Sequence, residues 1–373
     1  MDSEKEKKTE FAKLILAYAV FSGSTLFFSS LFESYFYKLE LEIYQIILSA
    51  VCLYIPPILM IFLTKEVRLK EGLKRSAIFM SLAALVLYLF VSPLAPVISR
   101  ALIGISMFYF WMPFNTHFYS YTKNNAAVLG SIYYSLSPFL SLFFPVFAGT
   151  IAKDFGFDLV FFISIFAFLP LIPIVMKFKE DIKYKIEIKK KFDEVNGLKS
   201  MIFIEGFALN TITPVTLSAM MLIHFKDPLE FGSFLSATTL FAIAASVLTA
   251  KISDKFKNRK DFINISGLGF LIGAIVTLIS QSKEEFFIGF GIINFFRSIL
   301  LPLPLAVMID KGKDLFDSMI SREIILNAGR ILAVVLGAIL IYFYDIRIML
   351  GIQTIATGAY IVIFQIKKRK LNL

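Results

Sequence analysis

The sequence predicts an all-α membrane protein with twelve transmembrane helices in two pseudo-symmetric six-helix bundles, both termini lying in the cytoplasm. Three observations predict this fold: the composition, the spacing of apolar blocks and the placement of basic residues. Of the 373 residues, 57% are hydrophobic and only 18% are charged, with a mean hydropathy of +0.75. Soluble domains carry about 25% charged residues, so this composition matches lipid rather than water as the solvent.

The apolar blocks are spaced as membrane spans. About 20 residues cross the hydrocarbon core, so roughly twelve spans fill a chain of this length and leave no room for a soluble domain. Reading the blocks between charged segments predicts spans at residues 12–37, 43–63, 76–92, 97–118, 128–151, 157–176, 200–224, 230–250, 262–281, 286–309, 320–344 and 346–366.

Lysine and arginine residues indicate the orientation of these spans. With a cytoplasmic N-terminus, 30 of the 38 basic residues fall in inside segments, five fall outside and three fall within spans. Cytoplasmic loops of membrane proteins carry such an excess of basic residues. The asymmetry therefore predicts an even number of spans with both ends inside, and we expect the plasma membrane as the location.

A basic stretch near the midpoint predicts how the chain is divided. We predict an N-terminal bundle at 1–178, a basic cytoplasmic linker at 179–199 and a C-terminal bundle at 200–373. The linker has two interpretations. It is either a strand or helix lying on anionic lipid, where each basic residue contributes about 1 kcal/mol, or a solvated tether between the halves.

The two halves resemble each other, as in transporters built from repeats. The basic segments 63–75 and 248–260 follow the second and eighth predicted spans at an offset of 185 residues. The fifth and eleventh spans align at an offset of 188, which matches Gly149 to Gly337. Two matches at nearly one offset, on either side of the basic linker, indicate an internal duplication.

Residues 254–260, DKFKNRK, resemble the loop signature of the major facilitator superfamily, with Lys257 where that family usually has glycine. Arg100 and Gly104 resemble its R-x-x-x-G pattern, and Pro145 with Gly149 resembles its Gly/Pro-rich motif. The resemblance covers nearly the whole chain. It implies two bundles that rock about a central cavity (alternating access), with the first, fourth, seventh and tenth spans lining that cavity.

The loop at Asp254 also has a physical interpretation of its own. Its carboxylate can pair with Arg259 or with the positive end of a neighbouring helix, so we expect Asp254 and Arg259 to act as a conformational latch. The alternative is an ordinary surface charge. In the first-half copy, Leu69 stands at the position of the acidic residue.

Polar residues inside the predicted spans indicate a binding site. An ionisable residue at mid-bilayer costs about 2.5–3.5 kcal/mol, and Arg297 and Arg330 are the two deep arginines, whereas Arg100 lies near a span end and is expected to snorkel to the surface. The predicted substrate-binding residues are Arg297, Arg330, Asn327, Asn294, Asn210, Ser22, Thr25 and Ser29. The alternative is that the deep arginines form structural ion pairs, for example with Glu205.

Two carboxylates, Glu33 and Glu205, are candidates for proton coupling, and the alternative is that both are interfacial. The sequence contains no nucleotide-binding loop, metal-ligand cluster or nucleophile constellation. We therefore expect no cofactor, no bound metal and no enzymatic activity. The expected partners are a small-molecule solute, protons as a candidate coupling ion and the lipid bilayer, without nucleic acid, and the expected state is a monomer.

The sequence thus favours a secondary active transporter that moves a small solute, with an organic anion preferred because two positive charges lie at mid-depth. A first alternative is proton-coupled efflux of hydrophobic compounds, which suits a cavity rich in Phe, Met and Tyr. A second alternative is a membrane receptor or scaffold without transport activity.

Overall fold

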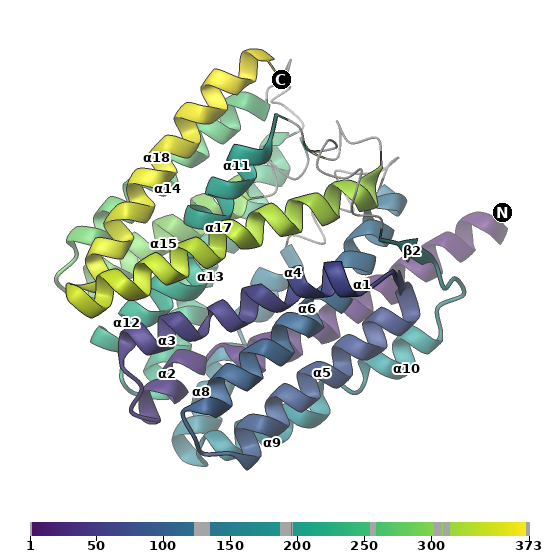
Figure 1. Cartoon of the computed structure of the whole chain (residues 1–373), viewed down its shortest axis with the longest axis horizontal. Helices are drawn as coiled ribbons and strands as arrows, with labels where there is room; N and C mark the ends of the chain where they lie inside the picture. The colour runs from purple at the N-terminus through teal and green to yellow at the C-terminus, as the bar shows by residue number, and fades with distance from the viewer. Residues whose placement is uncertain are drawn as a thin grey trace.

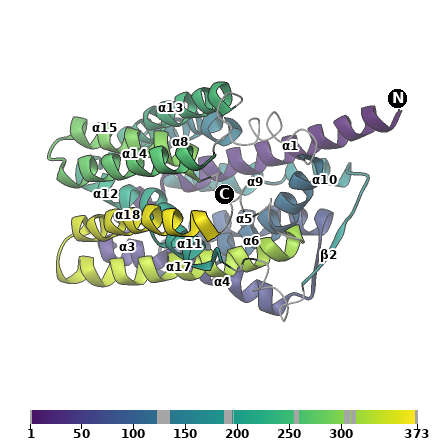
Figure 2. The ribbon, with the colours of Figure 1, turned by 90° about the horizontal axis from the view of Figure 1, so that it is seen from above.

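The computed structural model is almost entirely helical, and its helices run alongside one another (Figure 1). The structure describes residues 2–122, 135–186, 195, 197–253, 259–301, 308 and 314–370. The first helix, α1, extends beyond the neighbouring helices toward the N-terminus (Figure 2). The long helix α17 packs along α3 and α4, so the second half of the chain meets the first half there.

Breaks within several spans divide the first half into short helices. Its elements are α1 (Asp2–Ser29), α2 (Phe32–Lys38), α3 (Ile43–Ser49), α4 (Val51–Leu63), β1 (Glu66–Arg68), α5 (Leu69–Leu89), α6 (Leu94–Thr122), α8 (Phe144–Asp154), α9 (Phe157–Ala167) and α10 (Leu171–Met176).

The second half begins with the linker strand, and its longest helix, α17, has 29 residues, the same as α6 of the first half. Its elements are β2 (Lys183–Lys185), α11 (Lys199–Ile204), the π-helical segments η2 (Glu205–Leu209) and η3 (Ile212–Leu217), α12 (Ser218–His224), α13 (Pro228–Ser253), α14 (Arg259–Ile279), α15 (Lys283–Leu300), α17 (Leu315–Phe343) and α18 (Ile346–Lys370).

Within the described residues, ten helices are long and apolar enough to span a membrane. Described helices cover all or part of every predicted span. At the ninth and tenth predicted positions, α14 has a shorter apolar stretch, Ile263–Ile279, and α15 begins with three charged residues, Lys283 to Glu285. The all-helical membrane class is confirmed, whereas the count of twelve and the orientation of the termini stay predictions.

The distribution of side chains is that of a protein surrounded by lipid. Large apolar residues such as Leu63 and Ile355 face outward, with about three quarters of their surface exposed (75% and 74%). In contrast, the ionisable side chain of Glu205 and the amide side chain of Asn327 are each only 1% exposed. This inversion is favourable only where the surrounding solvent is hydrocarbon, because exposing apolar surface to water costs about 25 cal/mol per Å².

The linker is not a free tether where the structure describes it. Strand β2 pairs antiparallel with β1, with Val67 opposite Tyr184. Tyr184 also stacks on Phe316 of α17, at a ring separation of 4.9 Å. The ion pair with Lys183 holds the pKa of the Glu66 carboxyl below its usual value. Residues 183–185 therefore form a strand held against the first half, and the contact of the linker with anionic lipid stays a prediction.

Glycines allow backbones of different helices to approach closely at two places. A Cβ on Gly232 of α13 would lie 2.2 Å from the Pro145 carbonyl oxygen of α8. A Cβ on Gly206 would lie 2.1 Å from the Leu326 oxygen, and one on Gly329 would lie 2.2 Å from the Phe203 oxygen. The second contact fixes α17 against the π-helical stretch that follows α11.

Gly329→Ala is expected to destabilise the protein by about 1–3 kcal/mol, because the added methyl group overpacks a backbone contact that has no free space. The Ala328→Val variant is the matched control, since Ala328 is the neighbouring residue in α17 and is exposed. Thermal unfolding in detergent measures both variants. Equal unfolding temperatures for Gly329→Ala and the wild type would show that α17 can accommodate the added methyl group without loss of stability.

Candidate functional site

Two neighbouring cavities lie among the helices. The first, of about 390 Å³, is called the hydroxyl cavity because nine serine and threonine residues line it: Ser29, Ser30, Ser137, Ser141, Thr213, Ser218, Thr238, Thr239 and Ser298. The second, of about 470 Å³, is called the aromatic cavity because four aromatic residues line it: Tyr18, Tyr54, Phe108 and Trp111. Small-molecule sites commonly occupy about 300–1,000 Å³.

The two cavities share part of their walls. The shared lining residues are Leu53, Tyr54, Met107, Ser137 and Arg297. The spans implied by the family resemblance, the first, fourth, seventh and tenth, all contribute to the hydroxyl cavity. Residues from other helices line it as well, such as Tyr54 of α4 and Thr238 of α13.

Arg297 of α15 is the charged residue common to both linings. Its guanidinium forms no hydrogen bond or ion pair with any residue that the structure describes, and its Nε is buried without a partner. Asn294 and Ser298, on the same face of α15, line the hydroxyl cavity beside it. An arginine left without a carboxylate at this depth presents donors to whatever occupies the cavities.

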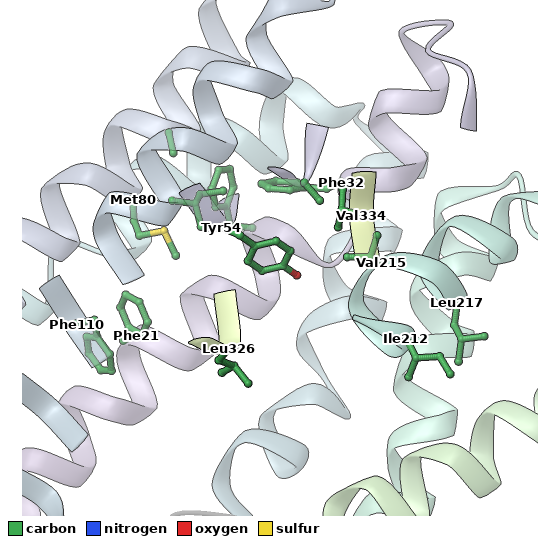
Figure 3. Close-up of a cluster of buried hydrophobic side chains, with 14 of the residues drawn as sticks. Phe21, Phe32, Tyr54, Met80, Phe110, Ile212, Val215, Leu217, Leu326 and Val334 are labelled. Atoms are coloured by element: carbon green, nitrogen blue, oxygen red, sulfur yellow. The ribbon is translucent and has the colours of Figure 1, made fainter. Parts of the chain in front are cut away.

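Arg330 of α17 is held in place, unlike Arg297. Its Nη1 donates to Asn327 Oδ1 at 2.9 Å and its Nη2 donates to Asn210 Oδ1 at 3.2 Å. Its guanidinium carbon lies 5.3 Å from the centre of the Tyr54 ring. Figure 3 shows Tyr54 among buried side chains of both halves, including Phe32 and Leu326. Neutral amide partners therefore fix the direction of the Arg330 guanidinium.

These contacts belong to a closed ring of polar side chains between the seventh span and α17. Arg322 Nη2 donates to Glu205 Oε1 at 2.5 Å, and Asn210 Nδ2 donates to the same oxygen at 3.2 Å. Asn327 Nδ2 donates to Glu323 Oε2 at 3.1 Å, and Glu323 Oε1 lies 3.7 Å from Arg322 Nη1, which closes the ring through Arg330. Glu323, Asn327 and Arg330, at positions i, i+4 and i+7, therefore share one face of α17.

The π-helical segments η2 and η3 place Asn210 in this ring. The chain leaves regular α-helical geometry on both sides of Asn210 and Thr211, and Pro214 lies within η3. Gln353 of α18 joins the break, because its Nε2 donates to Thr211 Oγ1 at 2.9 Å and its Oε1 accepts from Thr216 Oγ1 at 2.8 Å. Such π-helical turns occur frequently at functional sites.

Arg100 and Glu33 form a second buried ion pair. Arg100 Nη2 donates to Glu33 Oε1 at 2.9 Å, and its Nη1 donates to the Ile46 carbonyl oxygen at 2.6 Å and to Ser49 Oγ. Arg100 is 5% exposed and its guanidinium lies 4.8 Å from the Phe36 ring centre. The prediction that Arg100 snorkels to the surface is therefore wrong, because partners from α2 and α3 enclose it.

The expected alternative partner of the deep arginines is also wrong. Glu205 pairs with Arg322, and neither Arg297 nor Arg330 forms an ion pair among the described residues. Glu33 and Glu205 are 7% and 1% exposed, so both are enclosed by protein rather than placed at an interface. Glu33 lines the hydroxyl cavity, whereas Glu205 reaches the aromatic cavity through its partner Arg322.

The remaining predicted residues are distributed unevenly. Ser29 lines the hydroxyl cavity, and its Oγ donates to the Thr25 carbonyl oxygen. Thr25 Oγ1 donates to the Phe21 carbonyl oxygen, and neither Thr25 nor Ser22 belongs to the linings of the two cavities. The predicted latch falls outside the described part: Asp254 is not described, and Arg259 is described only as the first residue of α14.

Sequence reasoning missed several residues of the site. Arg322 is the third residue of the span predicted at 320–344 and is absent from the predicted binding residues, although it lies within α17 and lines the aromatic cavity. Its charge beside Glu323, within a predicted span, was a usable signal. Tyr54 and Trp111 carried no such signal, because aromatic residues are frequent throughout this chain.

Solved structures of transporters share this fold. A nucleoside transporter, NupG, superimposes with a TM-score of 0.67 at 12% identity, covering 96% of this chain and 99% of its own. A bacterial homologue of the iron transporter ferroportin, in an inward-facing state, has a TM-score of 0.73 at 11% identity, with 96% and 98% covered. The peptide transporter POT in complex with sulfate has a TM-score of 0.69 at 12% identity, with 96% and 93% covered.

The described part of the chain has ten helices long and apolar enough to span a membrane, and its fold is that of these solved transporters. The family model described as Major Facilitator Superfamily matches residues 198–371, which is the second half of the chain. The second half of the chain is thus similar to the Major Facilitator Superfamily, and the chain shares the fold of these transporters over 96% of its length. No curated protein matches the sequence.

Proposed function

We propose that this protein is a secondary active transporter in the plasma membrane that moves a small organic anion by alternating access, with both termini in the cytoplasm. The proposal is supported above all by Arg297, whose guanidinium lines both cavities and lacks a protein partner among the described residues. A buried charge without a counter-charge is costly. An anionic substrate supplies that counter-charge at the shared wall of the cavities.

Net charge supports the same substrate class. In the polar ring, the two carboxylates of Glu205 and Glu323 balance the two positive charges of Arg322 and Arg330. Arg330 itself is hydrogen-bonded to neutral amides. Glu33 balances Arg100 on the hydroxyl side. Among the residues that the structure describes, Arg297 then remains as the uncompensated cation of the site, which favours a substrate with a single negative charge over a dianion.

The two-bundle division supports alternating access within this proposal. Residues 1–178 and 200–373 form the two rocking bundles, and the cavities lie where their helices meet. Strand β2 of the linker ties to β1, while Tyr184 contacts Phe316 beyond the linker. The Asp254 and Arg259 latch stays part of the proposal and rests on the sequence alone.

Flux measurements in proteoliposomes test the proposal. Purified protein is reconstituted, and a library of radiolabelled organic anions, cations and neutral solutes is offered with and without a proton gradient. We expect uptake of anions only, in excess of protein-free liposomes. Zero flux of every solute with folded protein would contradict the proposal and favour the receptor or scaffold alternative.

Proton coupling is assigned within this proposal to Glu33 and Glu205. Each carboxylate is buried and bonded to an arginine, so protonation of the carboxylate releases the arginine to bind another group. If a proton gradient accelerates anion flux, the variants Glu33→Gln and Glu205→Gln distinguish the two residues. Substitution of the coupling residue abolishes the acceleration by the gradient and leaves the exchange of anions at equal pH intact, whereas substitution of the other residue keeps both.

A specific observation favours one second candidate, proton-coupled efflux of hydrophobic compounds. The aromatic cavity is lined by Phe108, Met107 and Met112 in addition to its tyrosines and its tryptophan. Such a lining accepts apolar molecules of varied shape. In the flux assay this candidate predicts proton-driven movement of neutral and cationic lipophilic dyes, whereas the anion proposal predicts none.

A further inference from the structure

The two cavities differ in the chemistry that they offer on either side of Arg297. Hydroxyls such as Thr239 Oγ1 and Ser298 Oγ donate to carbonyl oxygens of their own helices, so toward the hydroxyl cavity they present acceptor lone pairs, whereas Ser30 Oγ and Thr213 Oγ1 have no partner among the described residues. The aromatic cavity presents ring faces and apolar side chains beside five members of the polar ring, whose side chains bond one another. Most hydroxyls of the hydroxyl cavity therefore present acceptors to an anion at Arg297, and aromatic rings line the other cavity.

Acceptor oxygens repel an anionic group, so the rest of the substrate extends into the aromatic cavity. There Tyr18 and Trp111 meet edge to face, with ring centres 5.9 Å apart. Trp111 is partly exposed, in contrast to the fully buried Phe110 beside it. A wall of offset aromatic rings is complementary to a planar ring of a ligand, since aromatic pairs of this geometry attract one another beyond their buried area.

We infer that the substrates are aryl monocarboxylates: the carboxylate binds Arg297 at the shared wall and the aromatic ring lies in the aromatic cavity against Tyr18 and Trp111. This inference rests on the proposed function and narrows its substrate class. The cavity volume of about 470 Å³ accommodates one or two fused rings with a short side chain. Small polar anions leave the aromatic lining without a partner, and polyanions exceed the single free positive charge.

The single tryptophan of the chain reports directly on this cavity, because the sequence contains no other tryptophan than Trp111. The experiment titrates purified protein with 4-nitrobenzoate, whose nitroaromatic ring quenches tryptophan, and with 4-nitrobenzamide, its neutral counterpart of the same shape. Free N-acetyltryptophanamide corrects for absorption by the ligands. Binding is measured at equilibrium and needs no transport.

We expect saturable quenching by 4-nitrobenzoate at a concentration about tenfold lower than that needed for 4-nitrobenzamide, which corresponds to one charge-assisted hydrogen bond. Arg297→Gln removes this preference and leaves weak quenching by both compounds. The Arg347→Gln variant is the matched control, because Arg347 lies at the start of α18 outside both linings, and it keeps the preference.

Other outcomes separate this inference from the proposed function. Equal quenching by the two nitro compounds in the wild type, or a stronger competition by succinate than by benzoate, would overturn the aryl monocarboxylate class. Transport of succinate or lactate in proteoliposomes would then leave the anion proposal standing. Tyr18→Ala gives a second measurement: it is expected to weaken benzoate at least tenfold and to leave acetate unchanged, and equal losses for both would count against the ring contact.

Discussion

Replacement of Arg297 by glutamine is expected to reduce the affinity for the transported anion about 10- to 100-fold, and the transport rate at low substrate concentration with it. A hydrogen bond to a charged group contributes about 1.5–3 kcal/mol, and each 1.4 kcal/mol is tenfold in affinity. Arg330→Gln is expected to reduce affinity as well, because Arg330 lines the aromatic cavity and its positive charge, although balanced within the polar ring, adds to the potential at the cavity wall. Equilibrium binding of radiolabelled anion by each purified variant measures both effects.

The same variants are expected to differ in stability. Arg297 has no partner among the described residues, so Arg297→Gln relieves an uncompensated buried charge and raises the unfolding temperature of the ligand-free protein. Arg330→Gln removes the donors to Asn327 and Asn210 and lowers the unfolding temperature, because each lost hydrogen bond reduces the free energy of unfolding by about 0.5–1.5 kcal/mol. Unimpaired anion binding by both variants would contradict the proposal that Arg297 and Arg330 bind the transported anion.

Arg100→Leu is expected to cost about 3–5 kcal/mol of stability, because it leaves the Glu33 carboxylate buried without its partner. The variant also removes the donors to the Ile46 oxygen and to Ser49. The double variant Arg100→Leu with Glu33→Leu is expected to recover most of the loss, since replacing both members of a buried ion pair by apolar residues is often neutral. Unfolding in detergent, followed by circular dichroism, measures all three proteins.

An exposed ion pair on α5 gives the matched control for this cycle. Arg75 pairs with Glu71 one turn earlier, and the side chains are 47% and 50% exposed. Arg75→Leu is expected to cost about 1–2 kcal/mol, because it removes the exposed pair and the hydrogen bond that Arg75 Nη1 donates to Tyr109 Oη at 3.1 Å. If Arg100→Leu costs no more than Arg75→Leu, then Glu33 is not the buried partner of Arg100 in the folded protein.

The positions of the helices could be predicted from the sequence because hydropathy alone determines which segments lipid accepts. Helix ends were less predictable. For example, α5 begins at Leu69 rather than at residue 76, because the basic segment before the apolar block continues the helix. The β1 and β2 pairing was not predictable, because it joins residues more than a hundred positions apart through backbone bonds that no side-chain pattern encodes.

The site was predictable in its members and not in its pairings. The sequence indicated four of its residues, because charged and amide groups inside a span cost free energy and therefore mark functional positions. These residues are Arg297, Arg330, Asn327 and Asn210. Which arginine lacks a partner depends on contacts between distant helices, such as Arg330 with Asn210 and Arg322 with Glu205. The pair of Glu33 with Arg100 was missed for the same reason, because the helix position of Arg100 suggested a path to the surface.

Counterflow in proteoliposomes tests the central claim most directly. Liposomes containing the protein are loaded with unlabelled anion and diluted into a trace of the same anion in labelled form, at equal pH on both sides. We predict a transient accumulation of label above its equilibrium level in the wild type and its loss in Arg297→Gln, because exchange through a site that faces each side in turn produces such an overshoot. Label that only equilibrates, or an overshoot that Arg297→Gln retains, would contradict an anion site at Arg297 that operates by alternating access.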